Sequence, residues 1–347
     1  MTQKSDTNRR LVLAERPKGE PDDNTLRLDT ASVPEPGEGE MLLRTVYLSL
    51  DPYMRGRMSD APSYAAPVEI GGVMTAGTVS RVVKSNIDGF AEGDWVLSTG
   101  GWQDYSISDG QGVMNLGASP ERPSWALGIL GMPGFTAWAG LTQIGEPKEG
   151  ETIVVAAATG PVGATVGQIG KILGCRVVGI AGGPDKCAYG VDELGFDACI
   201  DHKADDFAAK LKAACPDGID VYYENVGGKV LDAVVPLLNI NGRVPVCGLV
   251  SGYNATSLPD GPDRMNWLMG QILRKQLTVR GFIIFNTFGH LYPEFSKAMG
   301  GWLKEGRITY REEMIDGLEN APRAFIGLLR GENFGKRVIR VGPDEAD

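Results

Sequence analysis

Residues 151–186 constrain the fold of this chain most, because they carry the pattern of a βαβ unit. The apolar, partly β-branched run 153–157 predicts a strand buried on both faces. A glycine-containing turn follows, and the apolar run 166–173 then predicts a helix with Gly174 at its C-terminal cap. A second buried strand is expected at 176–181. The length fits the roughly 30 residues of one βαβ unit, so a parallel sheet is predicted.

The turn between strand and helix has the residues of a dinucleotide-binding loop. It reads Ala158-x-Gly160-x-x-Gly163, a variant of the G-x-G-x-x-G fingerprint with alanine at the first position. Such glycines let backbone N–H groups approach a pyrophosphate at the helix N-terminus, where the helix dipole favours negative charge. Gly167 would allow close helix–strand packing. A glycine-rich turn without a ligand is the alternative, but the position between two buried strands favours a nucleotide site.

The end of the second strand indicates which dinucleotide binds. An NAD site usually has a carboxylate there for the ribose 2′-hydroxyl, whereas this strand ends Ile180-Ala181-Gly182-Gly183. Lys186 follows three residues later and could pair with a 2′-phosphate, which favours NADP. Asp185 is the competing residue. Because it follows Pro184 and precedes a helical run, it is better interpreted as a helix N-cap.

Composition and charge exclude several classes of function. The 347 residues suggest two domains. The net charge of -10 argues against binding to nucleic acid or anionic membranes. The polar N-terminus is no signal peptide, and no apolar run reaches the length of a membrane span. The five cysteines form no Cys-x-x-Cys pair, which predicts reduced thiols in the cytoplasm. The only histidines, His202 and His290, belong to no cluster, so no metal is expected.

The N-terminal part is predicted to be β-rich, with strands at 41–50, 77–83 and 94–98 and no helix of useful length before residue 124. Within it, Pro52 and Gly56 predict a loop. Tyr53 in this loop, and Tyr64 after it, could line a pocket. Ordinary amphipathic packing is the alternative that the residues alone favour.

The C-terminal part alternates strands and helices. Strands are expected at 198–200, 219–223, 243–249, 278–285 and 338–341, and helices at 124–144 with a break at 131–134, and at 187–194, 205–214, 229–238, 290–303 and 321–329. Ligands of open α/β sheets bind beyond the carboxyl ends of the strands. His202, Asn225 and Tyr253, with residues 282–284, are therefore expected at one crevice. The final strand is expected to complete the N-terminal domain.

Six motifs together resemble the zinc-independent branch of the medium-chain dehydrogenase/reductase superfamily. The similarity is to the leukotriene B4 dehydrogenase/prostaglandin reductase-type alkenal reductases, and within them to the bacterial NADPH-dependent curcumin reductases. It runs nearly end to end. The motifs are Asp51-Pro-Tyr-Met-Arg-Gly-Arg57, Gly131-Met-Pro-Gly-Phe-Thr-Ala-Trp138, Ala157-Ala-Thr-Gly-Pro-Val-Gly163, Tyr223-Glu-Asn-Val-Gly-Gly228, Cys247-Gly-Leu-Val-Ser-Gly-Tyr-Asn254 and Asn333-Phe-Gly-Lys336.

The resemblance implies a Rossmann doubly wound parallel sheet plus a β-rich GroES-like domain, usually in a homodimer. The expected domains are 1–130 with 310–347, which would be GroES-like, and 131–309, which would bind NADP(H). Lys186 would hold the 2′-phosphate, and residues 160–163 the pyrophosphate. Many relatives have tyrosine where His202 stands; histidine would make NADPH affinity depend on pH, because its ordinary pKa is near ~6.5. The implied cofactor residues are Met132, Thr136, Thr159, Gly160, Pro161, Val162, Gly163, Gly182, Lys186, His202, Asn225, Cys247, Gly248, Ser251, Tyr253, Phe282, Ile283, Ile284 and Asn333.

The resemblance also implies the reaction, in which NADPH supplies a hydride to the β-carbon of an α,β-unsaturated ketone or aldehyde. Negative charge then develops on the carbonyl oxygen, where a hydrogen-bond donor stabilises it. Tyr253 is the preferred donor, with Tyr53 and Tyr64 as alternatives; each is protonated at the ordinary tyrosine pKa near ~10. A quinone reductase of the same superfamily and a non-catalytic NADPH-binding sensor are the competing functions.

Overall fold

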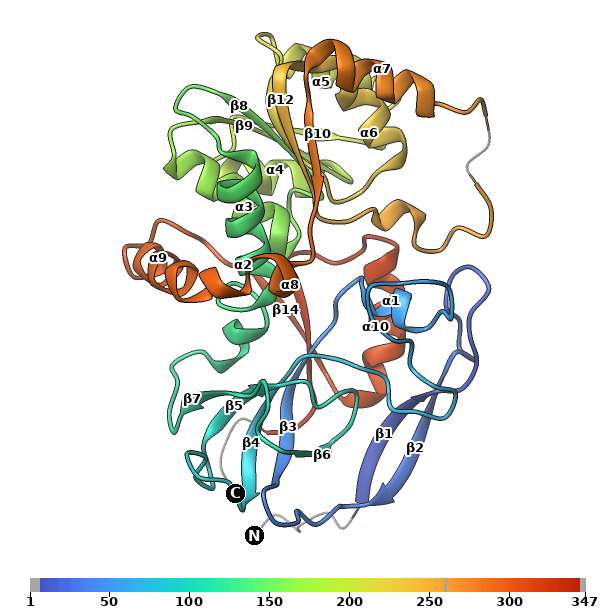
Figure 1. Cartoon of the computed structure of the whole chain (residues 1–347), viewed down its shortest axis with the longest axis vertical. Helices are drawn as coiled ribbons and strands as arrows, with labels where there is room; N and C mark the ends of the chain where they lie inside the picture. Colours follow the sequence, from blue (N-terminus) through green and yellow to red (C-terminus); the bar gives the residue numbers. More distant parts are fainter. Residues whose placement is uncertain (1–6, 259–260, 344–347) are drawn as a thin grey trace. The chain divides into compact units, whose positions relative to one another are not determined.

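The computed structural model describes residues 7–258 and 261–343, and it divides into two compact units. The first comprises residues 1–128 and 312–347, and the second residues 129–311. Figure 1 shows that the first unit is built mainly of strands and the second of strands layered with helices.

The first unit is built on a seven-stranded sheet, in which β3 (Met41–Ser49) lies centrally. The strand β15 (Lys336–Arg340) pairs with β3 in antiparallel register, so the end of the chain does complete the N-terminal domain. The other strands of the unit are β1 (Thr7–Leu13), β2 (Leu26–Ser32), β4 (Thr78–Ser85), β5 (Trp95–Ser98), β6 (Tyr105–Ser108), β7 (Met114–Gly117) and β14 (Glu312–Asp316), of which β1 and β2 form a separate hairpin. Its helices are the single turn α1 (Met54–Arg57) and α10 (Ala321–Leu329).

A buried apolar cluster joins α1 and α10 to the strands of this unit. Met54, Trp102 and Phe325 are fully buried in it, and the rings of Trp102 and Phe325 meet edge to face at 5.8 Å between centroids. Because Met54 is anchored in this core, the backbone of the adjoining residue Tyr53 is held in place.

The second unit contains six parallel strands in the order β10-β9-β8-β11-β12-β13. Numbered along the chain, this is the order 3-2-1-4-5-6 of the doubly wound dinucleotide-binding fold, which confirms the predicted fold class. Successive strands of the chain are added on one side of β8 up to β10 and on its other side from β11 onward, so the topological switch point of the sheet lies between β8 and β11. The strands are β8 (Thr152–Ala156), β9 (Arg176–Ala181), β10 (Ala198–Asp201), β11 (Ile219–Tyr223), β12 (Leu238–Val246) and β13 (Thr278–Gly281).

Helices cover both faces of this sheet. Phe207 of α5 (Phe207–Ala214), Val234 of α6 (Gly228–Val234) and Ile272 of α7 (Met265–Lys275) pack with Val154 and Val178 on one face. On the other face, α3 (Pro161–Ile172) approaches β8 and β9 so closely that a Cβ on Gly170 would lie 2.8 Å from Ile153. The remaining α-helices are α2 (Met132–Gly140), α4 (Pro184–Asp192), α8 (Ile284–Phe288) and α9 (Tyr292–Lys304).

Several local predictions were wrong. The expected strand 278–285 ends at Gly281, and Ile284 begins α8. The proposed break at 131–134 is mostly the first turn of α2, because Pro133 is tolerated there. Asp185 is not an N-cap: Gly183 holds that position, and Asp185 lies in the first turn of α4. In the part of the chain that the structure describes, no helix has the length and apolar character needed to cross a membrane.

Candidate active site

The turn between β8 and α3 is shaped by contact of backbone with backbone. A Cβ placed on Gly163 would lie 2.2 Å from the carbonyl oxygen of Ala157, closer than any side chain allows. Gly160 is the N-cap of α3, and its N–H donates to the same carbonyl at 3.0 Å. Ala157 itself has φ +51°. Glycine at 163 is therefore required by space, and α3 begins at the kind of strand–helix turn that binds anions in nucleotide-binding folds.

A basic cluster lies at the ends of β9 and β10. His202 directly follows β10, and its Nε2 is 3.0 Å from where a Cβ on Gly182 would stand. Asp201 orders both loops by accepting hydrogen bonds at 2.9 Å from the N–H groups of Gly183 and Lys203. Lys203 is a member that the sequence reasoning missed, although its adjacency to His202 was a usable signal.

The charge state of His202 follows from these neighbours. Partial burial of the ring lowers the pKa of His202 below 6.5, Asp201 opposes this, and the charges of Lys203 and Lys186 lower it further. The imidazole is therefore neutral at pH 7 in the absence of an anion. The charge of Lys186, in the first turn of α4, contributes to the lowered pKa of His202; that these residues bind a phosphate stays a prediction.

Asn225 lies where the growth of the sheet reverses. Its Nδ2 donates to the carbonyl oxygen of Ala156 at 2.8 Å, which joins the end of β11 to the end of β8. Ligands of such sheets bind at this switch point. Asn225 therefore lies at the expected edge of the sheet, where its side chain contacts the protein backbone, and its contact with a cofactor stays a prediction.

The segment 247–253 folds over this edge. The N–H groups of Cys247 and Gly248 donate to the carbonyl oxygen of Glu224 at 2.9 and 3.2 Å. The Tyr253 hydroxyl turns back to within 3.3 Å of where a Cβ on Gly248 would lie. The Tyr253 ring is half-buried, and Ser251 is exposed. This places Tyr253 at the carboxyl edge of the sheet, as expected.

Residues of α2 and of the segment after β13 pack behind the same edge. The buried Tyr223 hydroxyl donates to the carbonyl oxygen of Thr136 at 2.7 Å, and Thr136 Oγ1 donates to that of Met132. Phe282 and Ile284 are buried, and a Cβ on Gly140 would clash with both Phe282 and Tyr223. These side chains pack against one another inside the second unit. Their contact with a cofactor stays a prediction.

Tyr53, Tyr64 and Asn333 belong to the first unit. The Arg57 guanidinium lies over the rings of Tyr53 and Tyr64, at 5.7 and 4.6 Å from their centroids. Burial, reinforced by Asp51, raises the pKa of Tyr53, so its hydroxyl stays protonated. Tyr64 is 55% exposed, and Asn333 Nδ2 donates to the carbonyl oxygen of Gly335. The two tyrosines form one group with Arg57; their roles stay predictions.

Among the described residues, no three His, Cys, Asp or Glu side chains are grouped to hold a metal ion. Thiolates are the cysteine form that binds metals, but burial raises the pKa of the thiols. The affected residues are Cys175, Cys187, Cys199, Cys215 and Cys247.

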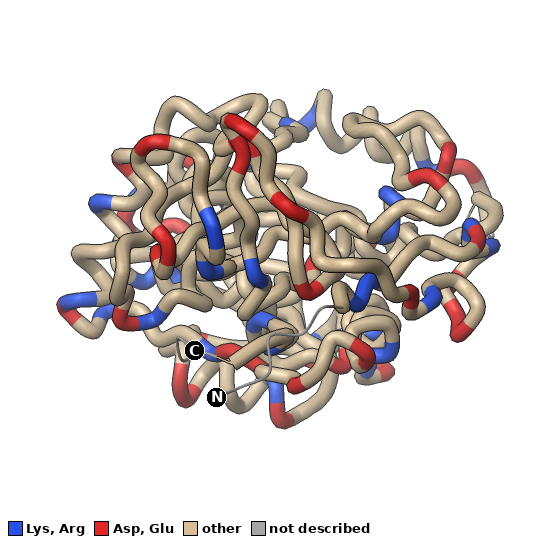
Figure 2. The backbone as a smooth tube through the Cα atoms, turned by 90° about the horizontal axis from the view of Figure 1, so that it is seen from below, with Lys and Arg blue, Asp and Glu red and all other residues tan. Residues whose placement is uncertain are grey.

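Acidic and basic positions are interspersed along the backbone (Figure 2).

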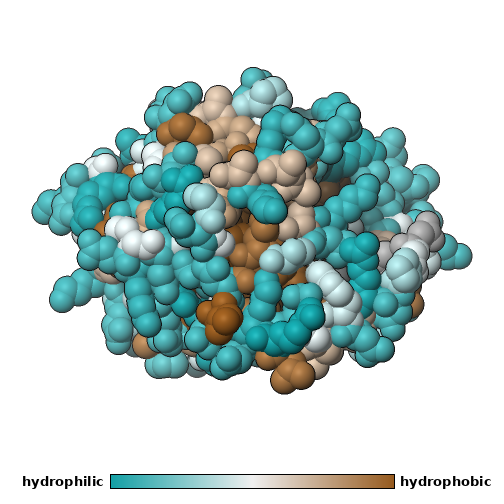
Figure 3. Space-filling view, turned by 90° about the horizontal axis from the view of Figure 1, so that it is seen from above, coloured by the Kyte–Doolittle hydropathy of each residue, from teal (hydrophilic) through white to brown (hydrophobic). Residues whose placement is uncertain are grey.

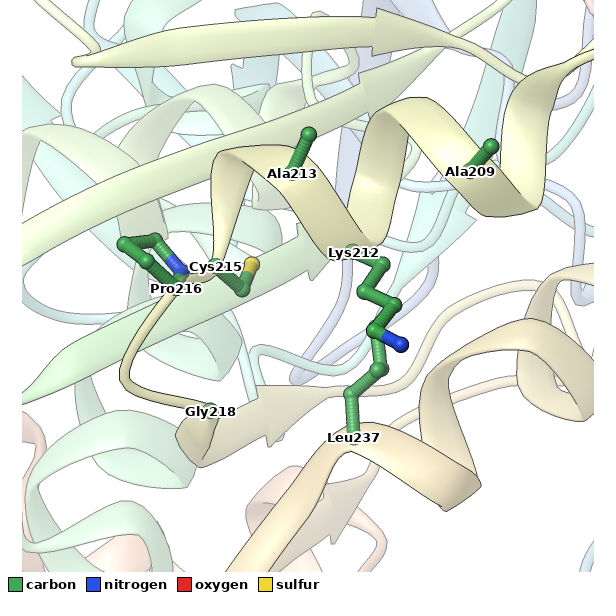
Figure 4. A pocket seen from close by; sticks show the side chains of 7 residues that line it. All are labelled: Ala209, Lys212, Ala213, Cys215, Pro216, Gly218 and Leu237. Carbon is green, nitrogen blue, oxygen red and sulfur yellow. The ribbon is translucent and has the colours of Figure 1, made fainter.

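A cavity of about 520 Å³ lies elsewhere, at the amino end of β11. Figure 4 shows Lys212 of α5 and Leu237 on its walls. Because this is the opposite end of the strand from Asn225, the cavity is separate from the candidate nucleotide-binding site at the carboxyl edge of the sheet. It is lined by Ala209, Lys212, Ala213, Cys215, Pro216, Gly218 and Leu237.

Comparisons with known proteins agree with this architecture. The family model described as the N-terminal domain of oxidoreductase matches residues 9–116, and the model described as zinc-binding dehydrogenase matches residues 161–301. The fold and the nucleotide-type turn thus define a two-domain oxidoreductase of the dehydrogenase class.

Individual relatives narrow the class. NADPH-dependent curcumin reductase of Escherichia coli is 64% identical over 99% of this chain and 100% of its own length. NADP-dependent 2-alkenal reductase of Nicotiana tabacum is 38% identical over 96% of this chain and 98% of its own. The crystal structure of CurA from Vibrio vulnificus in complex with NADPH has a TM-score of 0.95 and 61% identity, covering 96% of this chain and 99% of that one. The chain therefore belongs to the medium-chain dehydrogenase/reductase superfamily, in the group of alkenal and prostaglandin reductases.

Proposed function

We propose that this protein uses NADPH to reduce the C=C bond of α,β-unsaturated ketones and aldehydes, including substrates of the curcumin type. The observation that carries the proposal is the end-to-end 64% identity to an NADPH-dependent curcumin reductase. The 38% identity to a 2-alkenal reductase supports the wider substrate class.

The residues of the second unit fit NADP. The turn between β8 and α3 forms a cradle at the N-terminus of that helix, where backbone N–H groups can meet a pyrophosphate, and Gly163 permits the close approach of the helix to Ala157 that shapes this cradle. Lys186, Lys203 and His202 offer donors for a 2′-phosphate at the ends of β9 and β10. When bound, NADPH supplies the hydride.

The protein's own contribution to the chemistry is a donor at the carbonyl oxygen. A neutral tyrosine can donate its proton in a hydrogen bond to that oxygen as charge develops there. Tyr253 lies at the carboxyl edge of the nucleotide-binding sheet, which supports it as the first choice. Tyr53 has a raised pKa and is therefore also a neutral donor.

Cofactor choice is tested with Lys186→Ala. A charge-assisted contact is worth about 1.5–3 kcal/mol, or roughly 10- to 150-fold in affinity. The variant should lose this for NADPH and leave NADH nearly unchanged in steady-state kinetics. Equal losses with both cofactors would refute the assignment.

The reaction is tested by following NADPH consumption with 3-nonen-2-one, curcumin and a quinone, and by analysing the products. Saturated ketone from the enone and reduced curcumin are expected. Turnover with the quinone alone would support the quinone reductase instead, and no turnover on a broad panel would support the sensor.

We also propose a homodimer in the cytoplasm. The strand β13 is an edge of the parallel sheet, and Val279 on it is 46% exposed. On α7, Met265, Met269 and Leu273 form an exposed apolar row at helical spacing. The face seen from above shows hydrophobic side chains amid hydrophilic ones (Figure 3). Light scattering should give a dimer mass that Leu273→Glu reduces; a monomer in the unchanged protein would contradict the proposal.

A further inference from the structure

Glu224 is a buried acid that the chemistry above does not use. It directly follows β11 and is 1% exposed. Its Oε1 accepts two hydrogen bonds from backbone N–H groups, from Val226 at 2.6 Å and from Gly227 at 2.8 Å. The carboxylate therefore closes the turn that carries Asn225.

The other half of the carboxyl group is poorly satisfied. Among the described residues, Glu224 Oε2 and the buried Tyr222 hydroxyl have no hydrogen-bond partner of ordinary geometry, although the two groups are close enough for each to shift the pKa of the other. Burial raises the pKa of Glu224, while the two N–H donors lower it. An unsatisfied buried polar atom costs stability, so an apolar side chain would serve packing alone better than a polar one at this position.

The turn that Glu224 closes connects two other segments of the site. On one side, Asn225 Nδ2 donates to the carbonyl oxygen of Ala156, just before the turn of the pyrophosphate cradle. On the other side, the carbonyl oxygen of Val226 accepts from the Ser251 N–H at 3.0 Å and from Ser251 Oγ at 2.6 Å. The carbonyl oxygen of Asn225 also accepts from the N–H of Val250. Movement of this one turn would therefore displace both segments.

We propose that Glu224 is a positioning residue that holds the segment 247–253, with Tyr253, in register with the nucleotide-binding turn. The inference rests on the proposed function, which makes the segment 247–253 and the nucleotide-binding turn parts of one NADPH site. Glu224 touches neither reacting group; it acts through Val226 and Gly227. Its carboxylate supplies one oxygen that fixes two amides, which a neutral amide oxygen can also do.

Hydrogen exchange on the protein without cofactor tests the coupling. Glu224→Met keeps the side-chain length and removes the acceptor. Loss of hydrogen bonds to a charged group should speed exchange roughly 10- to 150-fold at residues 226–227 and, through Ser251, in 247–253. Glu224→Gln keeps an oxygen and should restore slow exchange in both segments. Tyr222→Phe, which removes only the opposing hydroxyl, serves as the matched control and should leave both slow.

Ligand titration adds the second readout. NADPH affinity of Glu224→Met should fall by about tenfold or more and that of Glu224→Gln should recover. If Glu224→Met does not fold, Glu224→Asp, whose carboxylate is one methylene shorter, takes its place. Faster exchange confined to 226–227, or spread over the whole sheet, would overturn the proposal. Failure of the unchanged protein to bind NADPH would instead overturn the proposed function, since the exchange pattern needs no cofactor.

Discussion

Gly163→Ala perturbs the point where α3 approaches the end of β8 most closely. The added methyl carbon would stand 2.2 Å from the carbonyl oxygen of Ala157, 2.8 Å from its carbonyl carbon and 2.9 Å from Ala158 Cα. All three are backbone atoms, so no side chain can turn away. Relief requires the helix N-terminus or the turn to shift by about an ångström, given an ordinary carbon contact of about 3.5–4.0 Å.

The cost follows from overpacking, which is typically about 1–3 kcal/mol and occasionally more. For a unit the size of residues 129–311, each kcal/mol lowers Tm by about 2–4 °C, so a decrease of about 2–12 °C is expected in calorimetry. Because the same shift misplaces the N–H groups of the cradle, NADPH affinity should also fall. The rate of reduction should fall as well, since a misplacement of about 1 Å can lower a rate by about 10²-fold.

A second glycine separates the clash from helix propensity. Gly300 lies within α9, and nothing is within 4 Å of a Cβ placed there. Gly300→Ala should therefore stabilise the protein by about 0.5–1 kcal/mol and leave NADPH binding unchanged. If Gly163→Ala were as stable as Gly300→Ala and bound NADPH equally well, the backbone account of the turn would be refuted.

Three further predictions concern single side chains. Tyr253→Phe should lower kcat more than it raises KM, by up to about 10²–10³; an unchanged kcat with intact NADPH binding would remove Tyr253 from the catalytic residues. NADPH binding should strengthen as pH falls toward the lowered pKa of His202 and level off below it, since a phosphate dianion favours the imidazolium and so raises that pKa in the complex; calorimetry in buffers of different ionisation enthalpy should show proton uptake that His202→Gln reduces. Lys336→Met should destabilise the protein by about 3–5 kcal/mol in denaturant unfolding, because its buried ammonium donates to Asp51 Oδ1 at 2.6 Å and its loss strands that carboxylate; the double change with Asp51→Asn should recover most of the loss, and additive losses would contradict the pairing.

The parallel sheet could be predicted from the sequence because its central strands are buried on both faces. Arg176–Ala181 and Ile219–Tyr223 were located to the residue, since each is a short apolar run bounded by polar or glycine residues. By contrast, Met114–Gly117 is largely exposed and pairs through its backbone, so no hydrophobic pattern marks it. The apolar run 282–285 misled for a related reason: it begins α8, whereas the strand before it is exposed.

The candidate site was predictable where a motif specifies backbone geometry. The close approach at Gly163 and the position of Asn225 at the sheet edge both follow from the order of strand, turn and helix. Lys203 and Glu224 were not recognised as participants. Their roles depend on contacts across loops distant in sequence or on burial of a charge, which composition and periodicity do not reveal.

Transfer of deuterium from [4,4-²H₂]NADPH tests the central claim most directly. The protein is incubated with an α,β-unsaturated ketone and the labelled cofactor, and the product is examined by NMR. The account predicts a saturated ketone with one deuterium on the former β-carbon and the carbonyl group intact. Deuterium on a carbinol carbon would contradict it. An unsaturated ketone left unreduced by a protein that oxidises the labelled cofactor with a quinone would also contradict it.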